Sequence, residues 1–169
     1  LFDDLLKEKT ELTNLDEYLE KAADQFVCKT PGYGVEICAG LHWFVRWGRD
    51  TFLSLPGLTL YRENPKPEVC KEVLKTMLQD LKGGLLTNIG VGQSAQYNSA
   101  DASLWFFWAL QEYVEVTKSP AETWKYFRNE INHILDKYKE GTLYNIHMKK
   151  NGLLYGGQEN VALTWMDAV

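Results

Sequence analysis

The chain has 169 residues and a formal net charge of -5, and this length suits one domain with its own core. A mildly acidic net charge without a cluster of basic residues argues against nucleic acid and anionic membranes as partners. The longest apolar runs, such as residues 104–110, are much shorter than the roughly 20 residues of a membrane span, so we expect no membrane partner.

The three cysteines are widely spaced and form no CxxC pair: Cys28, Cys38 and Cys70. This spacing disfavours structural zinc and a disulfide framework, and it favours reduced thiols in a cytoplasmic protein. The three histidines have no HxxxH or HxH spacing, so we expect no metal site and no cofactor. Aromatic residues make up 13% of the chain, and many of them fall in predicted loops, which favours a carbohydrate ligand.

The N-terminal part of the chain predicts one helix followed by a turn. Thr13 or Asn14 provides an N-cap, and apolar residues then recur at helical spacing as far as Val27. A cluster of proline and glycine at residues 30–34 predicts a turn. Residues 35–40 fit either a short strand or a loop.

Two more helices are predicted in the middle of the chain. One covers about residues 50–61, and the next carries apolar residues at helical spacing between Val69 and Leu81. Gly83 and Gly84 are expected to end the latter helix. Residues 85–98 have the composition of a loop.

The C-terminal part predicts two further helices and a long tail. Residues 99–101 begin a helix that is apolar almost all round, which indicates burial on most sides. Ser119 and Pro120 then provide the cap and first-turn proline of a fifth helix, which ends at Gly141. The tail, residues 142–169, predicts a long loop with a hairpin at residues 150–152.

These elements predict an all-α domain of antiparallel helical hairpins. Long connections rich in Trp, Tyr, Asn and Asp alternate with short ones, and long loops in a compact domain are usually functional. Helical hairpins with their long loops at one end form a cleft there.

The densest group of chemically specialised residues contains Trp47, Arg49 and Asp50. Indole rings cover the apolar faces of a pyranose, while a guanidinium and a carboxylate make directional hydrogen bonds to its hydroxyls. This combination favours a sugar site. The alternative interpretation is that Trp43 and Trp47 are a buried pair beside a surface Arg–Asp ion pair.

Three aspartates are candidates for acid–base chemistry. A carboxylic acid beside a Trp face is desolvated, which raises its pKa and suits a general acid, and Asp167 beside Trp165 fits this role best. Its alternative role is a helix cap. Asp50 and Asp101 are each predicted at a helix N-terminus, where capping is the default explanation. The neighbouring Arg49 favours Asp50 as a hydrogen-bond acceptor for sugar hydroxyls.

Three motifs resemble the amylo-alpha-1,6-glucosidase domain of glycogen debranching enzymes. They are WGRDTF at residues 47–52, YNSADASLWFF at residues 97–107 and LTWMDA at residues 163–168. The segment from Gly152 also resembles the family's DGLL-type segment, although Asn151 replaces the usual Asp. The resemblance runs in the family's order from about residue 15 to the end of the chain.

The resemblance implies an (α/α)6 toroid related to glucoamylases and the inverting hydrolysis of α-1,6-linked glucose at glycogen or limit-dextrin branch points. It implies that Asp167 is the general acid. The implied substrate-binding residues are Trp47, Arg49, Asp50, Tyr97, Asn98, Asp101 and Trp165. The implied partner is a branched α-glucan.

The chain is shorter than a complete toroid of this family. Twelve helices of about 12 residues with connections of about 5 residues need roughly 200 residues. We therefore expect residues 1–169 to be a single incomplete domain, the N-terminal half of the toroid, with the general base further along. The chain alone is expected to be inactive and to need the remainder of its catalytic domain. Smaller departures from the family are Thr87, where Pro is usual, and Arg46, where an acidic residue is common.

Two alternatives to a debranching glucosidase remain at this stage. One is a glucoamylase-like or trehalase-like toroid glycosidase with a different linkage preference. The other is a non-catalytic glucan-binding module that retains the pocket and lacks the base.

Overall fold

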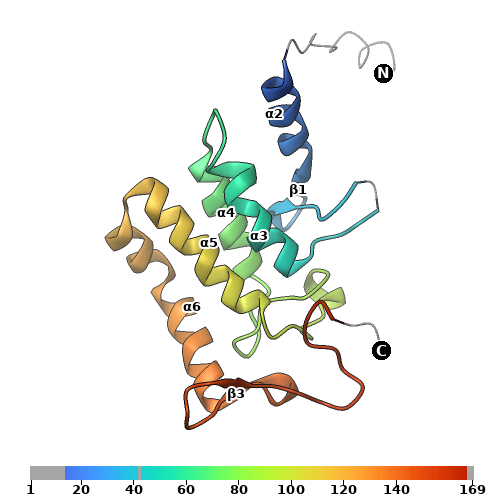
Figure 1. The fold of residues 1–169 in the computed structure, drawn as a ribbon, viewed down its shortest axis with the longest axis vertical. Helices are drawn as coiled ribbons and strands as arrows, with labels where there is room; N and C mark the ends of the chain where they lie inside the picture. Colours follow the sequence, from blue (N-terminus) through green and yellow to red (C-terminus); the bar gives the residue numbers. More distant parts are fainter. Residues whose placement is uncertain (1–13, 42, 167–169) are drawn as a thin grey trace.

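A computed structural model of the chain describes residues 14–41 and 43–166. These residues form a mostly helical structure with two small antiparallel sheets (Figure 1). The α-helices are α2 (Leu15–Phe26), α3 (Gly48–Thr59), α4 (Pro67–Leu78), α5 (Ala102–Thr117) and α6 (Pro120–Glu140). The short elements are the strands β1 (Val27–Thr30), β2 (Gly34–Ile37), β3 (His147–Met148) and β4 (Leu154–Tyr155), and the 3-10 turns η1 (Gly92–Ser94) and η2 (Leu143–Asn145). All five predicted helices are confirmed, and the mostly helical structure is compatible with the predicted helical fold, to which the two small hairpins add.

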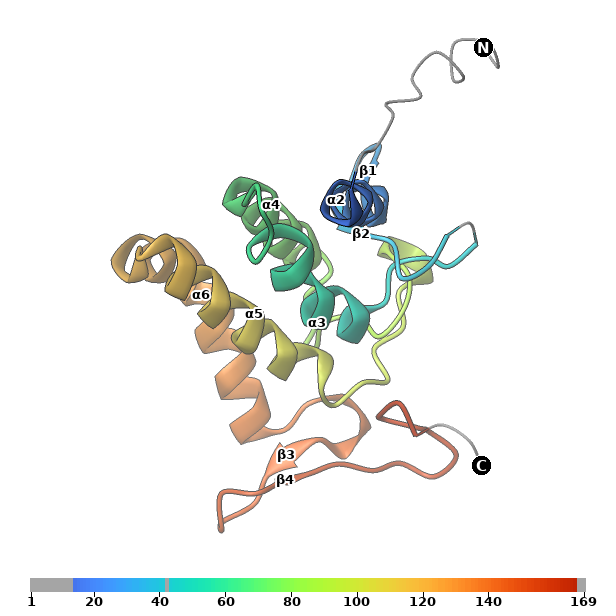
Figure 2. The same cartoon turned by 45° about the horizontal axis from the view of Figure 1, so that its top comes forward.

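The core lies around α5, with α3 and α4 on one side and α6 on the other (Figures 1 and 2). The ring of Phe106 meets Phe52 of α3 edge-on at a centroid distance of 5.8 Å, and it meets Phe127 of α6 at 6.3 Å. All three rings are fully buried. The prediction that α5 is buried on most sides is confirmed, since Leu104, Gln111 and Glu115 are the exposed residues of this helix and the others are buried or partly buried. None of the helices among residues 14–41 and 43–166 has the length and apolar composition needed to cross a membrane.

The N-terminus of α3 packs closely against the loop after α4 and the start of α5. The Gly48 N–H donates to the Asn88 carbonyl at 2.9 Å, and a Cβ on Gly48 would lie 2.1 Å from the Thr87 carbonyl oxygen and 3.1 Å from the Ala102 Cβ. Only a glycine fits between these groups. The glycine of the WGRDTF motif therefore brings the loop after α4 and the start of α5 against α3.

The β1–β2 hairpin corrects the predicted end of the first helix. Val27 was expected to be helical, but it begins β1 and pairs with Ile37 in an antiparallel register. The Cys38 N–H also donates to the Phe26 carbonyl at 2.9 Å, which ends the helix by strand pairing. A helical periodicity cannot reveal this, because the pairing partner is ten residues further along. The second hairpin was predicted and is confirmed by the β3–β4 pairing.

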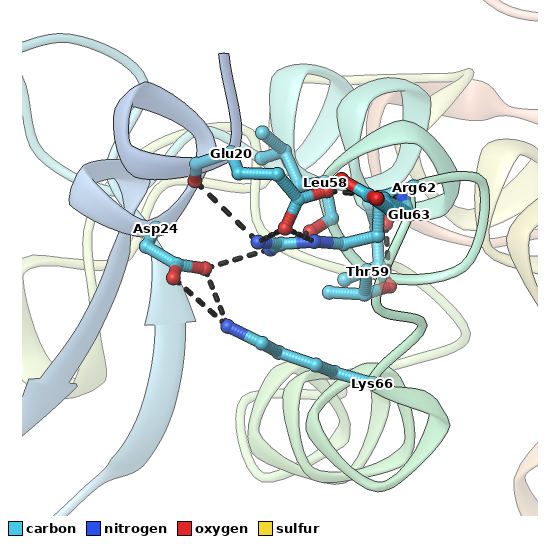
Figure 3. Close-up of polar contacts among 8 residues, drawn as sticks. Glu20, Asp24, Leu58, Thr59, Arg62, Glu63 and Lys66 are labelled. Atoms are coloured by element: carbon cyan, nitrogen blue, oxygen red, sulfur yellow. Dashed lines mark hydrogen bonds and ion pairs between the residues drawn. The ribbon is translucent and has the colours of Figure 1, made fainter. Parts of the chain in front are cut away.

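Charged side chains attach α2 to the rest of the domain. No residue of α2 is buried, and Leu15, for example, is 70% exposed. Arg62, just after α3, forms ion pairs with Glu20 and with Asp24, the latter at 2.7 Å (Figure 3). Lys66 also contacts Asp24 at 2.7 Å. The position of α2 therefore depends on ion pairs more than on apolar burial.

Two alanine substitutions within α3 distinguish the effect of close backbone packing on stability from the effect of helix propensity. Gly48→Ala is expected to destabilise the intact protein by about 1–3 kcal/mol, because the new methyl group clashes with the Thr87 carbonyl and crowds Ala102. Gly57→Ala is the matched control, since a Cβ there has nothing within 4 Å, and it should be neutral or stabilise by about 0.5–1 kcal/mol. Thermal or denaturant unfolding measures both. Equal stabilities of the two variants would contradict this account of Gly48.

Candidate functional site

A bidentate ion pair between Arg49 and Asp101 joins the N-termini of α3 and α5. Arg49 Nε donates to Asp101 Oδ2 at 2.6 Å, and Arg49 Nη2 donates to Asp101 Oδ1 at 3.0 Å. Asp101 also accepts hydrogen bonds from Ser99 Oγ at 2.6 Å and from Trp105 Nε1 at 3.3 Å. Such a set of charge-assisted bonds fixes the plane of the guanidinium.

The electrostatics of Asp101 follow from these contacts. Burial by itself raises the pKa of the carboxyl, but hydrogen bonds from Arg49 and Ser99, the charge of Arg49 and the Trp105 indole together hold that pKa below its usual range. Asp101 is therefore a carboxylate at neutral pH, and its chemical role is to orient Arg49.

The structure corrects the helix-cap interpretation of Asp101 and Asp50. Asp101 occupies the N-cap position of α5 but makes no side-chain cap hydrogen bond, because its oxygens face Arg49. Ser99 Oγ instead accepts from the Ala102 N–H at 3.1 Å. For α3 the N-cap is Trp47. Asp50 lies in the first turn of α3 and is exposed. A negative charge at this position stabilises the helix through its interaction with the helix dipole.

A cavity of about 580 Å³ brings together three of the predicted substrate-binding residues: Arg49, Asp50 and Trp165. Its other walls include Phe26 and Ile37. Trp165 is 70% exposed, so its indole offers a wide apolar face to a ligand. A guanidinium, a carboxylate and an indole around one cavity are the groups that a pyranose requires.

The remaining predicted substrate-binding residues lie outside the lining of this cavity. Trp47 is half-buried, and its backbone forms a β-bridge with Ile89. Tyr97 donates its hydroxyl to the Asp80 carbonyl at 2.9 Å, and burial, followed by the charge of Asp80, raises the pKa of that hydroxyl. Asn98 Nδ2 donates to the Ala162 carbonyl at 3.3 Å.

The loop at residues 97–101 also positions the C-terminal segment. The Ala100 N–H donates to the Leu163 carbonyl at 2.8 Å, beside the Asn98 contact to Ala162. The Ala100 carbonyl in turn accepts from the Tyr138 hydroxyl of α6 at 2.9 Å. These bonds hold the segment that carries Trp165 next to α5. The predicted general acid, Asp167, lies outside the described residues.

Family comparison agrees with the three motifs. A family model described as amylo-alpha-1,6-glucosidase matches residues 21–169, which is most of the chain. The chain belongs to the amylo-alpha-1,6-glucosidase family. The glycogen debranching enzyme of Saccharomyces cerevisiae is 36% identical over 93 residues, which are 51% of this chain and 6% of the yeast protein. The chain thus matches only a small part of the length of this curated relative.

Two site residues of this family member were not predicted from the sequence. Trp105 lies four residues after Asp101 on the same helix, a spacing that places the two side chains side by side, so its contact could have been anticipated. The Ser99 hydroxyl donates to Asp101 and accepts from the first residue of α5. The sequence around Ser99 gave no signal for this double contact. Within the part of the chain that the structure describes, no group of three or more His, Cys, Asp or Glu residues is arranged to hold a metal ion.

Replacing Asp101 by Asn tests the Arg49–Asp101 pair. Asp101→Asn should lower the free energy of unfolding at pH 7 by about 1.5–3 kcal/mol, the range for hydrogen bonds to charged groups. Because the folded-state pKa of Asp101 is lowered, the stabilisation is present above the ordinary Asp pKa of about 3.9 and is lost as the pH falls through the lower folded value. The stability gap between the wild type and the variant should therefore be constant from pH 7 to about pH 5 and narrow below about pH 4.

Denaturant unfolding across this pH range measures the difference in stability between the wild type and Asp101→Asn. Asp136→Asn on the surface of α6 is the control, since the Asp136 side chain is 61% exposed and 4.0 Å from Lys139. Equal stabilities for the two variants at pH 7, or a gap that widens on acidification, would reject the structural role of the pair.

Proposed function

We propose that the chain forms part of an inverting α-1,6-glucosidase domain that releases glucose from the branch points of glycogen or limit dextrin. The observation that supports this proposal most strongly is the Arg49 guanidinium, held by Asp101 at 2.6 and 3.0 Å, beside a cavity that Asp50 and Trp165 also line. Membership of the amylo-alpha-1,6-glucosidase family supports the same chemistry.

In the proposed complex, the terminal glucose stacks one apolar face on Trp165. Asp50 accepts hydrogen bonds from its hydroxyls, and Arg49 donates to their oxygens. The exposure of Asp50 and Trp165 leaves these groups accessible to a ligand. Trp47, Tyr97, Asn98 and Asp101 then act as supports for this cavity, through the backbone and side-chain contacts described above.

Hydrolysis requires an acid and a base. We assign the acid to Asp167, which protonates the glycosidic oxygen of the departing glucan. Inversion requires a second carboxylate about 6.5–9.5 Å from the acid, with a water molecule between them. We assign that base to the remainder of the catalytic domain, because the family resemblance puts it beyond this segment.

We propose that the helices form part of an (α/α)6 toroid. The arrangement of the long loops supports this architecture, since residues 85–98 bond to the start of α3 and the C-terminal segment bonds to the start of α5. Both loops thus meet at the same helix ends, as a cleft at one end of a toroid requires.

Replacing the acid tests the proposed reaction in the intact protein. Asp167→Asn should reduce glucose release from limit dextrin by about 10²–10⁴-fold, the usual contribution of a general acid, while glucan affinity is retained. Asp50→Ala should weaken glucan binding, because it removes an acceptor for the sugar hydroxyls. Asp136→Asn is again the surface control and should alter neither quantity.

The assays are glucose release and glucan titration. A wild-type rate for Asp167→Asn would reject the assignment of the acid. If the wild-type protein binds glucan and releases no glucose, the domain is instead a non-catalytic glucan-binding module.

A further inference from the structure

We propose that Asn151 is a modification site that converts spontaneously to aspartate and isoaspartate with loss of ammonia. Asn151 lies in the turn between β3 and β4, and Gly152 follows it directly. The reaction consumes only water and needs no enzyme. It does not depend on the proposed glucosidase activity, so a failure of that proposal would leave this one intact.

The reaction joins the side-chain amide to the next backbone nitrogen. The Gly152 nitrogen loses its proton to solvent and attacks Cγ of Asn151. A C–N bond forms, the Cγ–Nδ2 bond breaks, and Nδ2 takes a proton from solvent and leaves as ammonia. The product is a five-membered succinimide ring. Water then opens the ring at either of its two carbonyl carbons, which gives aspartate in one case and isoaspartate in the other.

Gly152 leaves the attacking nitrogen unhindered. A glycine carries no side chain next to its nitrogen, and even a Cβ added at Gly152 would have no heavy atom within 4 Å. Asn151 is also the only asparagine of the sequence that a glycine follows. The combination of a reactive amide and an open nitrogen therefore occurs once in the sequence, and it falls in this turn.

The turn is accessible to solvent over its whole length. Every residue from 148 to 160 is exposed, and the turn lies at the edge of the structure (Figure 2). The Gly152 N–H donates to the Lys149 carbonyl at 2.9 Å, and this bond has to open before the nitrogen reacts. Opening costs little, because water replaces the bond and because β3 and β4 have only two residues each, too few for a stable hairpin on their own.

Neighbouring groups favour the attack once the nitrogen is free. The Leu153 N–H donates to Asn151 Oδ1 at 3.1 Å. Negative charge develops on this oxygen when Cγ is attacked, and a donor already in place stabilises it. Lys149 and Lys150 precede Asn151 in the same turn, and their positive charges favour the deprotonated form of the Gly152 nitrogen.

Conversion changes both the charge and the backbone of the hairpin. Each event replaces a neutral amide by a carboxylate next to Lys150. Isoaspartate also adds a methylene group to the main chain of the turn, and the register of a hairpin depends on the length of its turn. We therefore expect the pairing of β3 with β4 to loosen, with faster amide exchange at residues 147–155.

Ageing of the intact protein, followed by site-resolved peptide mass spectrometry, tests the site. In neutral buffer at physiological temperature, Asn151 should gain the mass difference between an amide and an acid and give both aspartate and isoaspartate. Asn160 is the matched internal control. It is exposed, and the Val161 N–H after it donates to the Gln158 carbonyl at 3.2 Å, so its turn has the same form. Because the β-branched side chain of Val161 crowds the nitrogen, Asn151 should convert at least about tenfold faster than Asn160.

Two further comparisons check the mechanism. Mildly alkaline buffer should accelerate the conversion of Asn151, because the attacking nitrogen has to lose its proton. Asn151→Gln should keep its mass on ageing, since the longer side chain cannot form the five-membered ring. Hydrogen–deuterium exchange at residues 147–155 should become faster in the aged wild type and stay unchanged in aged Asn151→Gln. Melting temperatures of the fresh proteins verify that the variant is folded.

Three outcomes would overturn the site. They are equal rates at Asn151 and Asn160, conversion of Asn151 only after denaturation, which would mean that the folded turn protects it, and aspartate without isoaspartate, which would exclude the ring intermediate. Converted protein with unchanged exchange at residues 147–155 would overturn the predicted loosening of the hairpin.

Discussion

The ion pair between Arg49 and Asp101 is the interaction on which the candidate site depends. It joins two helix N-termini that are 52 residues apart in the chain, and both groups are partly shielded from water, with side-chain exposures of 16% and 24%. Truncation of either partner would leave the other charge poorly compensated. Because Ser99 and Trp105 also bind Asp101, the guanidinium is held before any ligand arrives. Such preorganisation is what transition-state stabilisation by fixed charges requires.

Backbone geometry makes this pair possible. Gly48 allows α3 to approach the Thr87 carbonyl and Ala102, so Arg49 starts its helix within reach of Asp101. The loop at residues 97–101 then bonds to Leu163, which brings Trp165 to the cavity of Arg49 and Asp50. Segments from three parts of the chain thus meet at one end of the helices. The proposed sugar site therefore requires that all three segments keep their positions.

Local patterns in the sequence were sufficient for the helices and for one hairpin. Apolar residues at helical spacing predicted α2 to α6, and the glycine turn after Lys150 predicted the β3–β4 pairing. The sugar-binding interpretation of Arg49 and Asp50 stays a prediction, although both residues line one cavity. These features depend on neighbours within a few residues, which a single sequence displays.

The strand β1 and the role of Asp101 depend on distant partners. A rule for helix caps assigned Asp101 to its own helix, whereas Arg49 binds its carboxylate. The burial of Arg46 was equally invisible, because its partners Glu36 and Asp80 come from two separate segments.

Hydrogen–deuterium exchange on the intact protein carrying Asp167→Asn tests the central claim most directly. The claim is that α3, the loop at residues 97–101 and the segment of Trp165 form one glucan site. Addition of a branched limit dextrin should slow amide exchange at residues 47–50, 98–101 and 163–166 together, while the outer face of α6 is unaffected. Protection confined to one of these three segments, or found only elsewhere in the protein, would contradict the account.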